Sequence, residues 1–162
     1  AASDVYKRQG HEPVAEFTIT NEILQTYWDE VCHKESGPAD YLQIGCPNCS
    51  AEELINIWRY MNGRKVKKGV RFCVFTNIAQ YAMAEQAHII HDLKDWGVEI
   101  LTSGCILRTI NVAKGAKSLG LSSFKLCNGS KDERDCPIYY GSDEQVIDAA
   151  ISGYWEVKRR YE

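Results

Sequence analysis

Apolar residues along this chain recur in two patterns, one typical of strands and one typical of helices. Short apolar runs rich in aromatic and β-branched residues predict buried strands over residues 41–44, 70–76 and 98–102. Two further short strands are expected over residues 122–126 and 138–140. Each of these runs is followed by small or polar residues, so the strands are short and separated by turns.

Between these runs, apolar residues spaced three and four apart predict amphipathic helices. The expected helices cover residues 20–34, 51–61, 77–97, part of 107–119, and 142–160. Ser50 with Glu53, and Ser142 with Gln145, have the spacing of capping boxes and so indicate where two of the helices begin. Gly63 and the glycines at 97 and 120 are expected to end helices.

The alternation of strands and helices predicts an α/β fold with a mostly parallel sheet of four to five strands and helices on both faces. The length suits one domain, which we expect over residues 14–162. Residues 1–13 are treated as a non-native or disordered leader and are left out of the fold prediction. In such a sheet the carboxyl ends of the strands share one edge, where ligands bind. Cys46, Thr76, Cys105 and a predicted turn at 128–131 are expected at that edge.

Composition and charge narrow the class of partner. The chain is 44% hydrophobic with a formal net charge of −3, which is typical of a globular protein and gives no indication of a nucleic-acid partner. No apolar run approaches the roughly 20 residues needed to cross a bilayer. The chain has 7 cysteines and no signal-peptide pattern, so we expect a cytoplasmic protein with structural, catalytic or metal-binding thiols rather than disulfides.

Cys46 lies where a predicted strand meets a predicted helix, within the motif Cys46-Pro47-Asn48-Cys49. A nearby helix N-terminus favours the thiolate, which is the form that binds metal. Together with Cys105, expected after another strand, it suits an Fe–S or other soft-metal site. The same pattern is compatible with a structural thiol or with a C-x-x-C redox pair.

Asn128, Ser130 and Lys131 bring two hydrogen-bonding side chains and a cation to a glycine-containing turn. Such a turn can bind a carboxylate or phosphate through backbone N–H groups and the ammonium. An ordinary polar turn, in which Gly and Asn serve the backbone alone, has the same composition.

From about residue 14 onward the sequence resembles the C-terminal part of the large subunit, or large domain, of the aconitase X family. The similarity rests on seven segments, two of which carry the characteristic Gly-Cys-Pro and strand-end Cys motifs. These are Ala39 to Pro47 with Ser50 to Leu54, Gly63 to Val66, Phe75 to Asn77, Gly97 to Cys105, and Tyr140 to Ser142 with Ala149 to Gly153.

The resemblance implies an Fe–S hydro-lyase, a dehydratase acting on a small hydroxy acid such as mevalonate 5-phosphate or cis-3-hydroxyproline. It implies that Cys46 and Cys105 ligate an iron–sulfur cluster whose third cysteine lies outside this chain. The open iron would act on the leaving hydroxyl as a Lewis acid. Asn128, Ser130 and Lys131 match a family segment and are expected to bind the anionic substrate, together with Thr76 at the same edge.

The resemblance also implies a partner, the small swivelling domain or subunit of the same enzyme, without which this chain is expected to be inactive. One stretch departs from the family pattern. Asp132-Glu133-Arg134-Asp135-Cys136-Pro137 replaces an apolar and aromatic run and is shorter. A non-catalytic remnant, or a thiol- or metal-binding module of the same fold, is therefore the alternative hypothesis.

Overall fold

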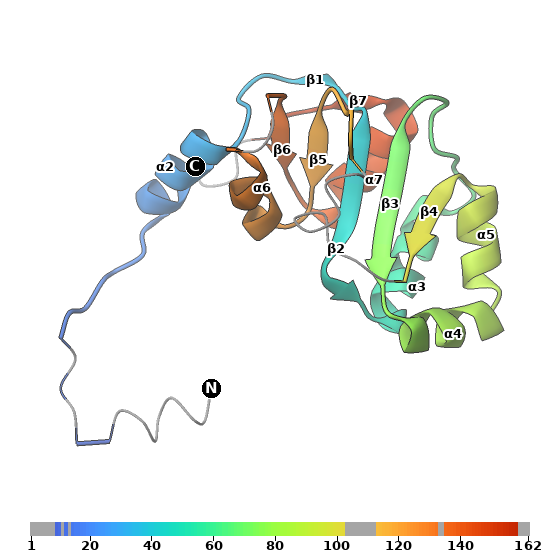
Figure 1. Cartoon of the computed structure of the whole chain (residues 1–162), viewed down its shortest axis with the longest axis horizontal. Helices are drawn as coiled ribbons and strands as arrows, with labels where there is room; N and C mark the ends of the chain where they lie inside the picture. Colours follow the sequence, from blue (N-terminus) through green and yellow to red (C-terminus); the bar gives the residue numbers. More distant parts are fainter. Residues whose placement is uncertain (1–8, 11, 13, 103–112, 133–134, 159–162) are drawn as a thin grey trace.

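The computed structural model describes residues 9, 10, 12, 14–102, 113–132 and 135–158. At its centre is a five-stranded, wholly parallel sheet with strand order β4-β3-β2-β5-β6 (Figure 1). Its strands are β2 (Tyr41–Cys49), β3 (Arg71–Thr76), β4 (Val98–Leu101), β5 (Leu119–Leu121) and β6 (Ile138–Tyr140). The described helices are α2 (Asn21–Val31), α3 (Ala51–Met61), α4 (Ile78–Gln86), α5 (Ile89–Asp95), α6 (Phe124–Ser130) and α7 (Asp143–Ser152).

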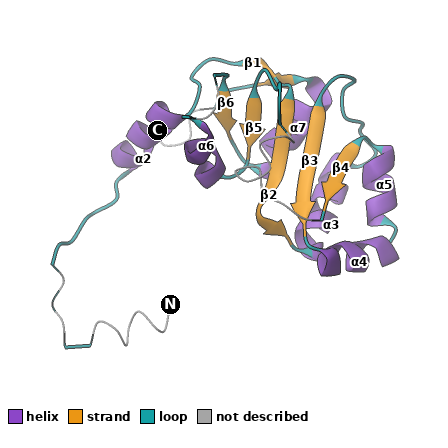
Figure 2. Cartoon of the chain, viewed as in Figure 1, coloured by secondary structure: helices purple, strands orange, loops and turns teal. Residues whose placement is uncertain are grey.

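Helices lie on both faces of this sheet, which confirms the predicted α/β architecture (Figure 2). Successive side chains of β3 alternate between two buried clusters. Phe72 and Val74 join the cluster formed with α3, α5 and α7. Cys73 and Phe75 join the cluster formed with α2 and α6. This period of two is what a strand buried on both faces requires.

Three helices begin where the sequence predicts. The hydroxyl of Thr20 accepts a hydrogen bond from the first turn of α2, and capping boxes at Ser50 and Ser142 open α3 and α7. At the other end of α3, Asn62 takes the left-handed conformation that ends a helix. The capping signals were local, so they could be recognised without the fold.

The single helix predicted over residues 77–97 is wrong, because two helices are present. α4 ends at Gln86, and His88 takes a left-handed conformation with φ 59° before α5 starts at Ile89. The break reorients the chain so that α5 packs its apolar side, including Leu93, into the core. Periodicity alone does not reveal such a break, since both helices carry the same spacing.

The predicted strand at 122–126 is also wrong. The strand is β5, three residues long, and the predicted strand residues largely belong to α6. Gly120, expected to end a helix, lies in the middle of β5. A Cβ there would lie 2.5 Å from Leu42 Cδ1 and 2.7 Å from a ring carbon of Trp155. Gly120 is therefore needed where a strand packs closely against its neighbours.

The last helix is shorter than predicted. α7 ends at Ser152, where Gly153 takes φ 71°, and β7 (Tyr154–Trp155) follows. β7 pairs antiparallel with β1 (Gly37–Pro38) in a separate two-stranded sheet. Among the described residues, no helix is both long and apolar enough to cross a membrane.

Candidate functional site

The part of β2 that carries Cys46 departs from regular pairing with β3. Ile44 pairs with Val74 and Cys49 pairs with Thr76, so four residues of β2 lie opposite a single residue of β3. Cys46 is half-buried, and the two residues after it are exposed. The predicted turn is thus an irregular continuation of the strand, and it presents Cys46 at the carboxyl end of the central strand.

Gly45 permits this path. Its φ of +108° lies in the region that residues with a Cβ rarely adopt. A Cβ at this position would also overlap the carbonyl oxygen of Phe75 on β3. Glycine directly before Cys46 is therefore required for β2 to bulge while staying close to β3.

Thr76 fixes the far end of the irregular segment. Its side chain is fully buried, and its hydroxyl donates a 2.6 Å hydrogen bond to the carbonyl of Cys49. This bond holds the end of β2 against the end of β3. The Thr76 hydroxyl thus donates its proton to a group of the protein itself. The expected contact of Thr76 with substrate stays a prediction.

The first turn of α3 holds the chain directly after Cys49. Glu53 accepts a 2.8 Å hydrogen bond from the backbone N–H of Ser50, and the Ser50 hydroxyl accepts from the N–H of Glu53. Gln80 of α4 accepts a 2.7 Å bond from the N–H of Ala51. Side chains therefore satisfy these N-terminal groups of α3, and the segment is fixed on both sides.

Cys49 does not share the accessibility of Cys46. Burial, together with the charges of Glu53 and Asp143, raises its pKa to about 12. At neutral pH this thiol keeps its proton, so it is a poor nucleophile. The geometry therefore disfavours the redox interpretation of the C-x-x-C motif. Of the six described cysteines, only Cys46 and Cys136 are half-buried rather than buried.

Sequence reasoning missed Asp143, the first residue of α7. This carboxyl is half-buried and hydrogen-bonded to Ser122, which follows β5. Burial raises its pKa, the bond from Ser122 opposes that shift, and the charges of Glu144 and Glu53 add to it. The capping box at 142–145 already indicated the position of Asp143 on its helix. Its neighbour Ser122 could not be recognised, because β5 was predicted in the wrong place.

The prediction of an anion-binding turn at residues 128–131 is wrong, because most of these residues are helical. Asn128 and Ser130 lie in α6, and Lys131 immediately follows it. Ser130 is buried, and Lys131 lines a hollow together with Ile138, the first residue of β6. Because a helix that follows a parallel strand runs back along the sheet, Lys131 lies toward the amino end of β6. The structure does not bring it to the edge that carries Cys46, and its binding role stays a prediction.

The second predicted cluster ligand, Cys105, lies outside the described residues. Within the described part of the chain, no three His, Cys, Asp or Glu side chains are grouped closely enough to hold a metal ion. Cys46 nevertheless fits the donor chemistry of an iron–sulfur site, since it offers a half-buried thiol at a strand end. It can serve as one ligand of a site whose other ligands come from elsewhere.

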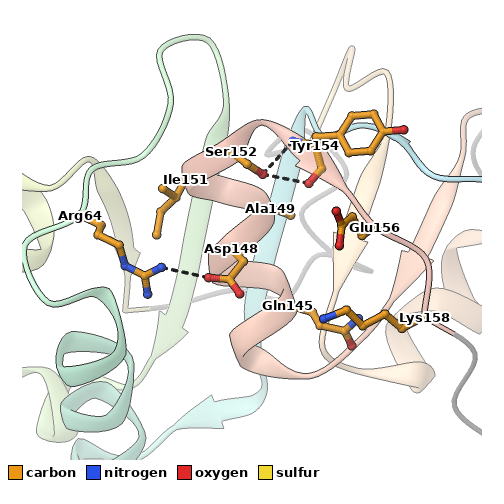
Figure 3. A pocket seen from close by; sticks show the side chains of 9 residues that line it. All are labelled: Arg64, Gln145, Asp148, Ala149, Ile151, Ser152, Tyr154, Glu156 and Lys158. Atoms are coloured by element: carbon orange, nitrogen blue, oxygen red, sulfur yellow. Dashed lines mark hydrogen bonds and ion pairs between the residues drawn. The ribbon is translucent and has the colours of Figure 1, made fainter.

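A hollow of about 500 Å³ lies beside α7, lined among others by Arg64 and Asp148 (Figure 3). Arg64 Nη1 lies 3.1 Å from Asp148 Oδ1, and its Nε donates to the carbonyl of Met61. These charged groups are thus paired with each other and with backbone. The hollow also reaches Ser152, at the end of α7 opposite to Asp143, so it is separate from the carboxyl edge of the sheet.

The fold and the Cys46 edge have a counterpart among known proteins. The family model for the aconitase X third domain matches residues 39–152. This match covers β2 through α7, including the bulged segment and Asp143. The chain belongs to the aconitase X family.

One curated relative and one solved structure are similar to this chain. The chain is 28% identical over 138 residues to cis-3-hydroxy-L-proline dehydratase of Hypocrea jecorina (strain QM6a), covering 83% of this chain and 23% of that protein. Its fold matches the crystal structure of Thermococcus kodakaraensis aconitase X (holo-form) with a TM-score of 0.71 and 17% identity, covering 90% of this chain and 37% of that one. The chain therefore spans less than two fifths of the length of either relative.

Proposed function

We propose that this chain is part of an Fe–S hydro-lyase and supplies one wall of the substrate pocket, with Cys46 as a cluster ligand. The observation that carries this proposal is the half-buried Cys46 thiol, held at the carboxyl end of the central strand within the matched family domain. Cys105 would be a second ligand, and the third would come from outside this chain. When bound, the cluster would supply a Lewis acid for the leaving hydroxyl.

The chain's own residues would hold the cluster ligand in place. Gly45 sets the path of the backbone into Cys46, and Thr76 anchors the carbonyl of Cys49 behind it. A dehydratase needs its reacting groups fixed before the substrate arrives, because misplacement by about 1 Å can lower the rate by about 100-fold. These contacts are what we propose the domain contributes to catalysis.

Charge at this edge supports a hydroxy imino acid, such as cis-3-hydroxyproline, over mevalonate 5-phosphate. The charged groups that act on Cys49 are the carboxylates of Glu53 and Asp143. Carboxylates attract the ring ammonium of hydroxyproline and repel a phosphate dianion. Lys131, the cation expected to bind an anionic substrate, lies toward the other end of the sheet. The curated relative named for cis-3-hydroxy-L-proline supports the same choice.

The remaining parts of the enzyme are also proposed. The small swivelling domain or subunit would close the pocket, and this chain alone would be inactive. Support comes from the share of the relatives that the chain covers, 23% and 37%. A cytoplasmic location is proposed because the described cysteines form no disulfide with one another, as expected in a reducing compartment.

The test uses the longer aconitase X polypeptide that contains this chain, with Cys46→Ser compared with Cys136→Ser. Both positions are half-buried thiols, so the second variant controls for loss of an accessible cysteine. We expect Cys46→Ser to lose bound iron, visible cluster absorption and dehydration of cis-3-hydroxyproline, while Cys136→Ser keeps all three. Mevalonate 5-phosphate is assayed in parallel, and preference for it would contradict the proposed substrate class.

A second candidate function is a non-catalytic remnant of the same fold. The observation in its favour is the displacement of Lys131 from the Cys46 edge, next to the stretch 132–137 that departs from the family pattern. If the longer polypeptide binds no iron and Cys46→Ser changes nothing, the remnant is the better description.

A further inference from the structure

The segment before α2 is an extended chain that stands apart from the described part of the sheet (Figure 1). Residues 15–19 are extended and, among the described residues, their backbone groups make no hydrogen bond. Val14, Phe17 and Ile19 expose 104%, 89% and 73% of their surface. Figure 1 shows this segment running away from the sheet before it enters α2.

Its sequence has the pattern of a strand with one apolar face. Ala15, Phe17 and Ile19 alternate with polar residues at 16, 18 and 20. Alternation over six residues places the apolar side chains on one face and the polar ones on the other. An isolated strand of this kind gains little stability, because its backbone groups and its apolar face both need a neighbouring sheet.

The apolar surface continues onto α2. Ile23, Leu24 and Tyr27 of that helix are 42%, 38% and 58% exposed, whereas Trp28, which neighbours Leu24 on the helix surface, is buried in the core. Thr20 caps α2, so the extended segment leads directly into the helix. Residues 14–27, called here the N-terminal apolar segment, therefore expose a continuous set of large apolar side chains.

The family match starts at residue 39, so the N-terminal apolar segment lies outside the matched domain. This chain corresponds to only 37% of the solved aconitase X chain, which leaves most of such an enzyme to supply the covering surface. The segment carries Glu16 and Glu22 but no Lys or Arg, so its partner should be apolar with a basic rim.

We propose that residues 15–20 add as an edge strand to a β-sheet in the other part of an aconitase X polypeptide, with α2 packing beside it. Backbone hydrogen bonds would join the two strands, and burial of Phe17 and Ile19 on one face would fix the register of the pairing. The strand-pairing proposal shares one premise with the proposed function, namely that this chain is part of an aconitase X enzyme.

Hydrogen exchange tests this pairing in the longer polypeptide that contains this chain. In the 162-residue chain alone, we expect the amides of residues 15–19 to exchange as in an unstructured peptide. In the longer polypeptide we expect their exchange to slow by about 100-fold or more. Phe17→Asp should abolish this protection, whereas Thr18→Asp, which places the same charge on the polar face, should keep most of it.

Three results would overturn or separate the proposals. Fast exchange at 15–19 in the longer polypeptide, with β2 amides protected and the protein therefore folded, would overturn the strand pairing. Dimers of the 162-residue chain that Phe17→Asp dissociates, measured by sedimentation, would identify a second copy as the occupant and overturn it too. Protection at 15–19 in a polypeptide without dehydratase activity would support the pairing and contradict the proposed function.

Discussion

The hydroxyl of Thr76 donates a 2.6 Å hydrogen bond to the carbonyl oxygen of Cys49. The two residues are 27 positions apart and also pair across β2 and β3. The bond closes the irregular part of β2, so that the chain returns to the sheet after presenting Cys46. The position of the candidate ligand therefore depends on a residue of the neighbouring strand.

Replacing Thr76 by Val should destabilise the domain. The change keeps the shape but leaves the buried Cys49 carbonyl without a donor, which costs about 1–3 kcal/mol. Thr76→Ser should retain the bond and most of the stability. The measurement is the free energy of unfolding in urea.

Thr26→Val is the matched control for Thr76→Val. The Thr26 hydroxyl also donates to a backbone carbonyl, that of Glu22, but at an exposed position. We expect a change within about 0.5 kcal/mol there. Equal losses at both positions would contradict the role given to the Cys49 carbonyl.

Gly45→Ala should destabilise more than Gly69→Ala. Both glycines have positive φ, 108° and 91°, so both substitutions carry the cost of a left-handed conformation. Only at Gly45 does the new Cβ also overlap the Phe75 carbonyl, while nothing lies within 4 Å at Gly69. We expect a difference of about 1–3 kcal/mol in the free energy of unfolding. A larger loss at Gly69 would show that β2 does not pass this close to β3.

Iodoacetamide should distinguish the two thiols of the C-x-x-C motif. Cys46 is half-buried, whereas the buried Cys49 has its pKa raised to about 12 and stays protonated well above neutral pH. We expect Cys46 to be alkylated at least about tenfold faster in the folded chain, with the difference lost in denaturant. Peptide mass spectrometry measures both rates. Similar rates in the folded chain would restore the redox interpretation.

Asp143→Asn should stabilise the domain at neutral pH. Burial raises the pKa of this carboxyl, so the folded state favours its protonated form. The stability that the protonated Asp143 carboxyl contributes is complete at pH values below its pKa in the unfolded chain. This stability is lost as the pH rises through its higher pKa in the folded chain. The neutral variant should therefore gain stability relative to the parent at pH 7, and the gain should vanish in acid.

Glu52→Gln is the control for this pH dependence. Glu52 is an exposed acid in the first turn of α3, so it shares the helix-terminus environment without the burial. Unfolding curves of both variants from pH 3 to pH 7 give the comparison. A gain for Asp143→Asn that persists unchanged in acid would show that its cause is not ionisation.

Some features of this protein follow from the sequence alone, because neighbouring residues determine them. The α/β class follows from apolar spacing, and the capping boxes at Ser50 and Ser142 place two helix starts correctly. The motif containing Gly45 and Cys46 likewise identified the family to which the chain belongs, although β2 continues through it to Cys49.

Other features depended on residues far apart in the chain. Position 120 of β5 requires glycine because Leu42 and Trp155 leave no room for a Cβ, which no local pattern shows. That error also placed Lys131 at the wrong edge and hid the bond between Ser122 and Asp143. Local patterns determine where chain elements begin and what they are, whereas packing between distant elements decides which side chains meet at the site.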